Sequence, residues 1–286
     1  MNRILLFAIS LAFFTSCTQT NNKQVVFASD NPAERVVWER IRLADPTTGV
    51  IPSNIRQKEM IFAKTLPKAT SYSKANWKNR GPYNVGGRTR ALAMDIQDEN
   101  ILFAGGASGG MFRSVDGGLS WAMTTSPNQL HNVTCVAQDT RTNHEDTWYF
   151  GSGELTGSSA SGGGSYYGGN GIYKSTDGGL NWDSLAVTAT NTNGFDSNFD
   201  FVWNVATDPS NDSLDVVYAA VYSAIYRSEN GGTSWTKVLG GGSAYYTNVE
   251  VTSSGVVYAT LSSDGTDKGI WRSTDGQNFT NITDTA

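Results

Sequence analysis

Hydrophobic residues recur at helical spacing before about residue 76 of this chain and in short strand-like runs after it. Between residues 30 and 75, apolar residues recur at helical spacing in "NPAERVVWERIRLA" and in "SNIRQKEMIFAKTLP". Pro32 suits the first turn of a helix, and Pro67 ends the second segment. The stretch is therefore predicted as a helical N-terminal segment with two helices. Their apolar sides are formed by Val37, Trp38, Ile41 and Leu43 and by Ile55, Phe62 and Leu66.

From residue 76 the pattern changes to short strands that repeat as four units. Each unit has an apolar strand, a strand ending in small residues, an aromatic strand and a Gly-rich turn, as in "TRALAMDI", "NILFAGGA", "GGMFRS" and "VDGGLSW". The serines before the turns lie 45 to 61 residues apart, at positions 114, 175, 228 and 273. Four strands at this spacing are typical of β-propeller blades, whereas a β-helix has a shorter repeat. The sequence predicts an all-β fold of four-stranded antiparallel blades at about residues 76–124, 130–185, 199–238 and 245–283.

Composition agrees with this fold and narrows the function. The chain has 31 Gly, 8 Trp, 12 Tyr and 12 Phe but only 16% charged residues, which favours strands and turns. Its net charge of -5 is spread without long runs, so no basic face is expected and nucleic acid is not a predicted partner. The His and Cys residues lack metal-ligand spacing, and we predict no metal and no cofactor. Cys135 is predicted as a small buried residue, and His131 and His144 as loop residues.

The N-terminus has the features of an export signal. A short positive start is followed by the apolar run "ILLFAISLAFF", which is too short to span a bilayer well. The "TSC" at residues 15–17 resembles the lipobox of bacterial lipoproteins, which implies lipidation of Cys17. The alternative is an ordinary signal peptide cleaved nearby. We predict a signal peptide over residues 1–17, a polar tether over 18–29, and an exported lipoprotein of the outer membrane or cell surface.

The repeated turn carries the pattern Ser-x-Asp-x-Gly-x-x-Trp, which resembles the Asp-box, or BNR repeat. A short Asp or Asn side chain caps backbone N–H groups in a tight turn, glycine permits positive φ, and the aromatic residue buries an apolar surface. We therefore predict a structural role for these turns, and the resemblance implies that they lie away from the functional face. The matching residues are Ser114, Asp116, Gly118 and Trp121; Ser175, Asp177, Gly179 and Trp182; Ser228, Asn230, Gly232 and Trp235; and Ser273, Asp275 and Phe279.

Longer strings point to a narrower group. "WKNRGPYNVGGRTRALAMD", "FAGGASGGMFRSVDGGLSW" and "DPTTGVIPSNIR" resemble the sortilin-like and xyloglucanase-like propellers of secreted Bacteroidetes-type proteins, over residues 33–286. Such relatives have more blades, so we predict that these four form an N-terminal arc of a propeller with seven to ten blades. Xyloglucanase-type enzymes carry an aspartate in a string like "RTDIGG", where this chain has Ala107. The Arg-Ile-Pro motif of sialidases is absent from the sequence.

Candidate binding residues lie near the start of the first inner strand and in one long loop. Arg88 and Arg90, with Asn84 before them, are predicted to face the central funnel, where propellers bind ligands. The Gly/Ser-rich loop from Gly151 to Gly171 either binds a ligand or is a plain insertion. Within it, Tyr166 and Tyr167 are candidates for stacking on sugar rings or peptide side chains.

Glu154 is the one carboxylate that we consider as a catalytic acid. Asp200 is its candidate partner, whereas Asp95 and Asp208 are predicted in turns after inner strands. The basic residues that precede the turn serines recur in every unit and are predicted as structural: Arg113, Lys174, Arg227 and Arg272.

Three functional hypotheses follow. The first is a surface-anchored, non-catalytic binding module for a protein or glycan ligand. The second is a glycoside hydrolase of xyloglucanase or sialidase type, which the missing aspartate at Ala107 disfavours. The third is a scaffold in an envelope complex.

Overall fold

The computed structural model describes residues 32–53, 55–66, 87–127, 129, 132–155, 167–192, 195–242, 244–262 and 265–283. Several predicted features lie outside these residues. They are the signal peptide with Cys17, the tether over residues 18–29, Asn84, His131 and Tyr166.

The two predicted helices are present as α1, Pro32–Leu43, and α2, Ile55–Thr65. The apolar side of α1 is exposed, with more than half of the Trp38 side chain accessible. The guanidinium of Arg42 stacks on the Trp38 ring at 4.6 Å. Neither helix, nor any other in the described part of the chain, is long and apolar enough to cross a membrane.

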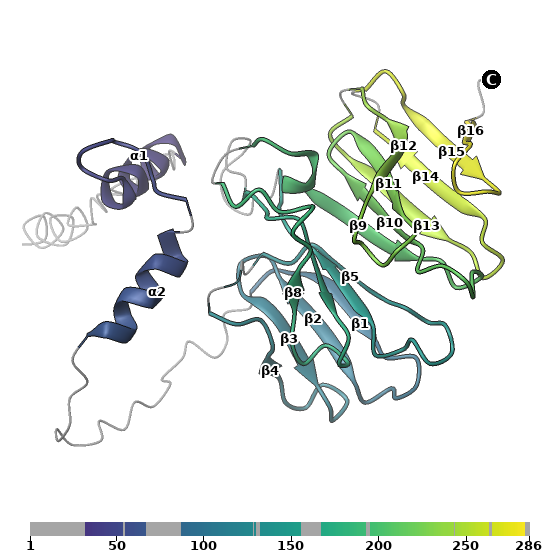
Figure 1. The fold of residues 1–286 in the computed structure, drawn as a ribbon, viewed down its shortest axis with the longest axis horizontal. Coiled ribbons are helices and arrows are strands. Elements are labelled where there is room, and N and C mark those ends of the chain that lie inside the picture. The colour runs from purple at the N-terminus through teal and green to yellow at the C-terminus, as the bar shows by residue number, and fades with distance from the viewer. Residues whose placement is uncertain are drawn as a thin grey trace, which may run out of the picture. The chain divides into compact units, whose positions relative to one another are not determined.

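The four predicted blades are four antiparallel sheets, each a meander of four strands in chain order (Figure 1). This confirms the predicted all-β propeller blades. The first sheet is β1 Thr89–Met94, β2 Leu102–Gly106, β3 Gly110–Ser114 and β4 Ala122–Met123; the second is β5 Cys135–Gln138, β6 Trp148–Gly151, β7 Ile172–Ser175 and β8 Asp183–Ser184. The third is β9 Val202–Thr207, β10 Val217–Val221, β11 Ala224–Ser228 and β12 Thr236–Gly240; the fourth is β13 Thr247–Val251, β14 Val257–Leu261, β15 Gly269–Ser273 and β16 Thr280–Asn281.

The first strand of each sheet lies beside the first strand of the next. Strand β1 contacts β5, β5 contacts β9, and β9 contacts β13. Hydroxyl groups near the strand starts also join consecutive sheets, since Thr134 donates to the Val202 carbonyl of β9 at 2.5 Å and Thr247 donates to the Val221 carbonyl of β10 at 2.7 Å. These four strands therefore form the inner wall of the propeller.

The apolar core is divided into three clusters, one between each pair of consecutive sheets. Side chains alternate along a strand, so neighbours on β6 face opposite sheets. Trp148 and Phe150 join the cluster with the first sheet, while Tyr149 joins the cluster with the third. All three are buried, and each such side chain stabilises the fold by about 1.5–3 kcal/mol. Packing between sheets, rather than within one sheet, therefore holds the blades together.

The serine–aspartate turns that follow β3, β7, β11 and β15 are built from short side-chain hydrogen bonds. The Ser114 hydroxyl donates to Asp116 at 2.7 Å and accepts from the Gly118 N–H at 2.9 Å. The Asp116 carboxylate also accepts from the Ser120 N–H at 2.8 Å and from its hydroxyl at 2.6 Å. Donation by Ser120 and Ser114 lowers the pKa of Asp116 to about 2. These contacts support a structural role. In the third turn Asn230 accepts from the Ser234 N–H at 2.9 Å, and its amide donates to the Ser234 hydroxyl at 2.9 Å.

Each of the later turns packs against the sheet before it. A Cβ at Gly179 would overlap the Phe103 ring, which is completely buried in the first sheet. Arg113 of the first sheet donates from Nε to the Gly178 carbonyl at 3.0 Å. Lys174 of the second sheet donates to the Gly231 carbonyl at 3.3 Å. Two of the recurring basic residues thus bond to the backbone of the next turn, whereas Arg227 bonds the Tyr218 hydroxyl at 3.1 Å and the Glu229 carboxylate.

Candidate functional site

The meander topology gives the blades two distinct ends. Each serine–aspartate turn follows the third strand of a sheet, so it lies at the same end as the loop between the first two strands. The starts of β1, β5, β9 and β13 lie at the other end, together with the long connection between β6 and β7. We call this second end the loop face. Arg88, Arg90 and the Gly151–Gly171 loop all belong to it.

An open hollow of about 440 Å³ lies between the inner strands of the four sheets. Its lining combines aromatic, amide, hydroxyl and guanidinium groups with a few apolar side chains, as ligand sites in proteins do. The lining residues are Arg90, Ala91, Leu92, Thr134, Cys135, Val136, Trp203, Asn204, Tyr246, Thr247 and Asn248. Every sheet contributes through its first strand, so the hollow exists only when the blades are assembled.

The structure brings three of the predicted site residues together. Arg88 donates to Glu154 Oε1 at 2.8 Å and also bonds the second carboxylate oxygen, while Arg90 lies 2.9 Å from Oε1. The Glu154 side chain is 1% exposed, whereas those of Arg88 and Arg90 are about one-third exposed. The guanidinium groups therefore present an accessible positive charge on the loop face, and the carboxylate lies beneath them.

This arrangement disfavours Glu154 as a general acid. A general acid must reach the leaving group with its carboxyl, whereas this carboxyl is buried and both of its oxygens are bonded by guanidinium groups. Its lone pairs are already directed at Arg88 and Arg90. The ion pair instead holds Arg90, which lines the hollow, with Arg88 bonded to the same carboxylate.

Asp200 lies at the base of the long loop, near Glu154. Its backbone carbonyl accepts from Gly169 N–H at 2.8 Å, and Glu154 and Tyr167 exchange two backbone hydrogen bonds of 2.8 Å. One carboxylate oxygen of Asp200 accepts from the N–H groups of Asp196 and Ser197, and the other has no hydrogen-bond partner among the described residues. Burial raises the pKa of Asp200. The structure thus places Glu154, Tyr167 and Asp200 around one loop base, with the Tyr167 side chain exposed.

Sequence reasoning missed an aromatic group on the same face. The rings of Trp203 and Tyr246 are 4.9 Å apart, and the Trp203 indole donates to the Tyr245 carbonyl at 2.8 Å. Tyr222 lies 5.8 Å from Tyr245 and 4.9 Å from Phe195. We call these five residues the aromatic group: Phe195, Trp203, Tyr222, Tyr245 and Tyr246. Three of them, Phe195, Tyr245 and Tyr246, are each nearly half exposed. The strings "FVWNV" and "AYYTNV" lie at the starts of inner strands, at positions equivalent to those of Arg88 and Arg90 in the first blade. This equivalent position could have identified their aromatic residues as candidates from the sequence.

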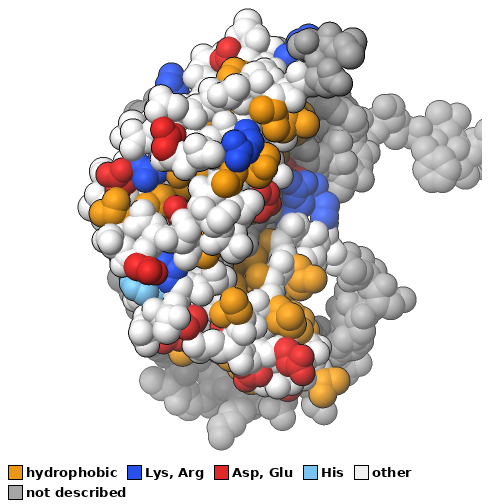
Figure 2. Space-filling view, turned by 90° about the vertical axis from the view of Figure 1, so that its right-hand side faces the viewer, with side chains coloured by type: hydrophobic (Ala, Val, Ile, Leu, Met, Phe, Trp, Pro, Cys, Tyr) orange, Lys and Arg blue, Asp and Glu red, His pale blue; other side chains and the backbone are white. Residues whose placement is uncertain are grey.

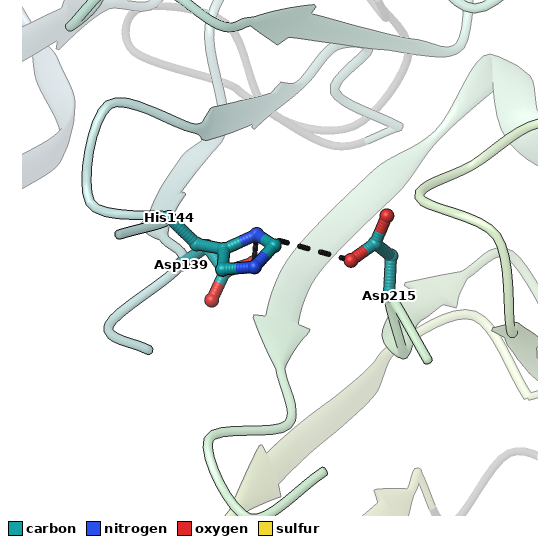
Figure 3. A group of neighbouring side chains, drawn as sticks. All are labelled: Asp139, His144 and Asp215. Carbon is teal, nitrogen blue, oxygen red and sulfur yellow. Dashed lines mark ion pairs between the residues drawn. The ribbon is translucent and has the colours of Figure 1, made fainter. Parts of the chain in front are cut away.

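A second polar cluster lies at the opposite end of the blades. Asp139 and His144 in the turn after β5 face Asp215 from the third sheet, and the histidine Nδ1 lies 3.9 Å from each carboxylate (Figure 3). Arg141 bonds the same two carboxylates at 2.6 and 2.7 Å and the Leu214 carbonyl at 2.9 Å. This hydrogen bonding lowers the pKa of Asp215. The guanidinium supplies the cation that the carboxylates require, so the cluster fits an ion pair between blades rather than a metal centre.

Surface charge is mixed on the face that Figure 2 shows. Figure 2 shows acidic, basic and hydrophobic side chains interspersed over one face of the described residues. Such a face lacks the continuous basic strip that a nucleic-acid backbone requires.

Comparisons with known proteins support the fold and leave the activity open. No family model matches the sequence, and no curated protein matches it. An ancestral GH74 enzyme is similar in structure, with a TM-score of 0.52 and 23% identity over 68% of this chain. The chain spans only 25% of that enzyme's length.

Two further solved structures show weaker similarity. The GH74 xyloglucanase from Xanthomonas campestris has a TM-score of 0.46 and 17% identity, over 70% of this chain and 30% of its own. YCF48 bound to D1 peptide has a TM-score of 0.44 and 15% identity, over 70% of this chain and 56% of its own. The fold class is a β-propeller, as the four meander sheets and the similarity to the ancestral GH74 enzyme show.

Proposed function

We propose that this chain is an exported β-propeller of the Asp-box type that binds a ligand on its loop face without catalysis. The observation that carries the proposal is the hollow between the four inner strands, with Arg90 on one side and Trp203 and Tyr246 on the other. Flat aromatic rings stack on the apolar faces of sugars, and guanidinium and amide groups bond hydroxyl or carboxylate groups. We propose a glycan as the ligand, with a protein ligand as the alternative.

A hydrolase function has less support. Retaining and inverting glycosidases both need two carboxyl groups flanking the scissile bond. At the turn between β2 and β3 the chain has Ala107, whose N–H donates to the Arg88 carbonyl at 2.9 Å. Glu154 is engaged by both arginines. Neither position supplies a free carboxylate.

Glycan-array screening followed by calorimetry tests the binding site. Trp203→Ala and Arg90→Ala are expected to weaken binding at least tenfold, since aromatic and arginine residues dominate such interfaces. Leu180→Ala is the matched control, because Leu180 is exposed on the serine–aspartate turn of the second sheet, away from the loop face. Unchanged affinity in both site variants would contradict the proposed location. Binding of a protein but of no glycan on the array would favour the alternative ligand.

Hydrolysis is tested separately on the glycans that bind. We expect no release of reducing ends by the wild-type protein. If products appear and Glu154→Gln abolishes them while binding is retained, the non-catalytic proposal fails.

Surface anchoring is the second part of the proposal. It rests on the "TSC" string that ends in Cys17, after an apolar run. Metabolic labelling with a radioactive fatty acid is expected to mark the wild-type protein and not Cys17→Ser, which should leave the membrane fraction. Equal labelling of both proteins would refute lipidation at this residue.

A further inference from the structure

Arg90 gives the hollow between the inner strands a positive charge. Of the described residues that line the hollow, Arg90 alone carries a formal charge, and the others are apolar, aromatic, hydroxyl or amide residues. Arg90 and Arg88 share one carboxylate, that of Glu154, so the three side chains together carry one net positive charge. Because the Glu154 side chain is buried beneath the two arginines, a ligand in the hollow meets the cation rather than the anion.

The guanidinium of Arg90 has an unused pair of donors. Its Nη1 lies 2.9 Å from Glu154 Oε1, and its Nε and Nη2 have no partner among the described residues. Arg88, in contrast, bonds both carboxylate oxygens of Glu154 with its two amino groups. The Nε and Nη2 hydrogens of a guanidinium lie side by side in one plane, which matches the spacing of the two oxygens of a carboxylate. Glu154 therefore holds Arg90 in place and leaves this edge of the guanidinium for a ligand.

Most other donors in the lining of the hollow are already bonded within the protein. The Thr134 and Thr247 hydroxyls donate to backbone carbonyls at 2.5 and 2.7 Å, and the Trp203 indole donates to another at 2.8 Å. The Asn204 amide nitrogen donates to Asn248 Oδ1 at 2.8 Å. The hydroxyl groups of a neutral sugar would therefore find few unused donors here, whereas a carboxylate would find two on one guanidinium.

We propose that the hollow binds a sugar that carries a carboxylate, as a uronic acid residue of a polysaccharide does. The carboxylate bonds Nε and Nη2 of Arg90, and the sugar ring stacks on Trp203 or Tyr246, whose rings lie 4.9 Å apart on the other side of the hollow. The chain has a net charge of -5, so attraction of an acidic sugar depends on this local cation rather than on the overall charge. The inference rests on the proposed binding function and names the class of its ligand.

Calorimetry with matched pairs of oligosaccharides tests the proposal. The acidic probes are oligomers of galacturonate, mannuronate and glucuronate, and the neutral probes are oligomers of galactose, mannose and glucose with the same linkages. A sulfated galactose oligomer is the third kind of probe. At least one uronate oligomer is expected to bind the wild-type protein at least about tenfold more tightly than its neutral counterpart. Because the guanidinium is partly exposed, this preference should decrease as the salt concentration rises.

Two variants and a charge control assign the preference to Arg90. Arg90→Gln should weaken binding of the uronate oligomer at least about tenfold and change binding of the neutral oligomer less than about threefold. Trp203→Ala should weaken binding of both oligomers and keep their ratio. Lys237→Gln removes the same charge from an exposed position on β12, outside the lining of the hollow, and should leave both affinities unchanged. Circular dichroism and melting temperature show whether each variant is folded.

The outcomes separate this inference from the proposed binding function. Equal affinity for uronate and neutral oligomers overturns the inference and leaves glycan binding in place. A uronate preference that survives in folded Arg90→Gln also overturns it, as does an equal loss in Lys237→Gln, because general charge attraction then explains the preference. Tighter binding of the sulfated oligomer than of every uronate overturns the assignment to a carboxylate. If no oligosaccharide binds, both this inference and the proposed glycan ligand fail.

Discussion

A matched pair of glycine substitutions measures how much the packing of one blade on the next contributes to the free energy of unfolding. Gly118 and Gly179 hold equivalent places in the turns of the first and second sheets, with φ of +89° and +75°. Alanine at either place adopts a left-handed conformation that costs about 1–2 kcal/mol. Within its own sheet, the new Cβ would meet Leu102 at 3.4 Å in the first turn and Trp182 at 3.4 Å in the second. These local terms are therefore nearly equal.

The difference between the two lies across the junction. Only at Gly179 would the Cβ overlap Phe103, whose ring is held 4.3 Å from Trp148 and 6.3 Å from Trp182. Because this ring is fully buried, it moves only with its neighbours, and overpacking of this kind costs about 1–3 kcal/mol. We expect Gly118→Ala to lose about 1–2 kcal/mol of unfolding free energy and Gly179→Ala about 2–5 kcal/mol.

Urea denaturation followed by tryptophan fluorescence gives both values. If Gly179→Ala loses about 2 kcal/mol more than Gly118→Ala, its urea midpoint lies about 1 M lower, for a dependence of the unfolding free energy on urea of about 2 kcal/mol/M. Equal losses, within about 0.5 kcal/mol, would refute the packing of the second turn on Phe103.

Three further predictions concern polar groups. Arg141→Met should lower the unfolding free energy by about 3–5 kcal/mol in urea denaturation, because it leaves the buried Asp139 carboxylate unpaired; a loss below about 1 kcal/mol would contradict this. Burial raises the pKa of Asp177, but donors from Asn181 and Ser175 outweigh it and hold the pKa at about 2. The ionised Asp177 carboxylate therefore stabilises the fold at pH values above the ordinary aspartate pKa near 3.9, and this stabilisation is lost as the pH falls towards 2. Between about pH 5 and about pH 2, the urea midpoint of Asp177→Asn should therefore fall less than that of the wild-type protein. Burial raises the pKa of the Cys135 thiol to about 11, so a thiol reagent at pH 8 should label it only after unfolding, and rapid labelling of the folded protein would refute its burial.

Much of the fold could be predicted because its signals are local. Alternation in "TRALAM" and the Asp-Gly turn of "VDGGLSW" fix strands and hairpins within a few residues. The spacing of Ser114 and Ser175 then identifies the repeat. The helix over Pro32–Leu43 followed from its periodicity, although the sequence could not show that its apolar side would be exposed.

The site was less predictable because it depends on contacts between distant segments. Arg88 and Glu154 were both singled out, but their ion pair joins residues 66 positions apart, and only the assembled sheets show it. Trp203 and Tyr246 were not singled out, since the strand pattern does not state which end of a strand lies at the funnel. The same holds for Arg141, whose partner Asp215 belongs to another blade.

The bonds from Arg113 and Lys174 to turn glycines end on main-chain carbonyls. A carbonyl is present whatever the side chains around it, so one blade recognises the next by its backbone path. Side chains elsewhere in a blade are then free to diverge, as the long insertion after Gly151 in the second blade illustrates. Blades built this way can be duplicated, lost or exchanged in evolution without redesign of the junction, provided that the glycine turn survives.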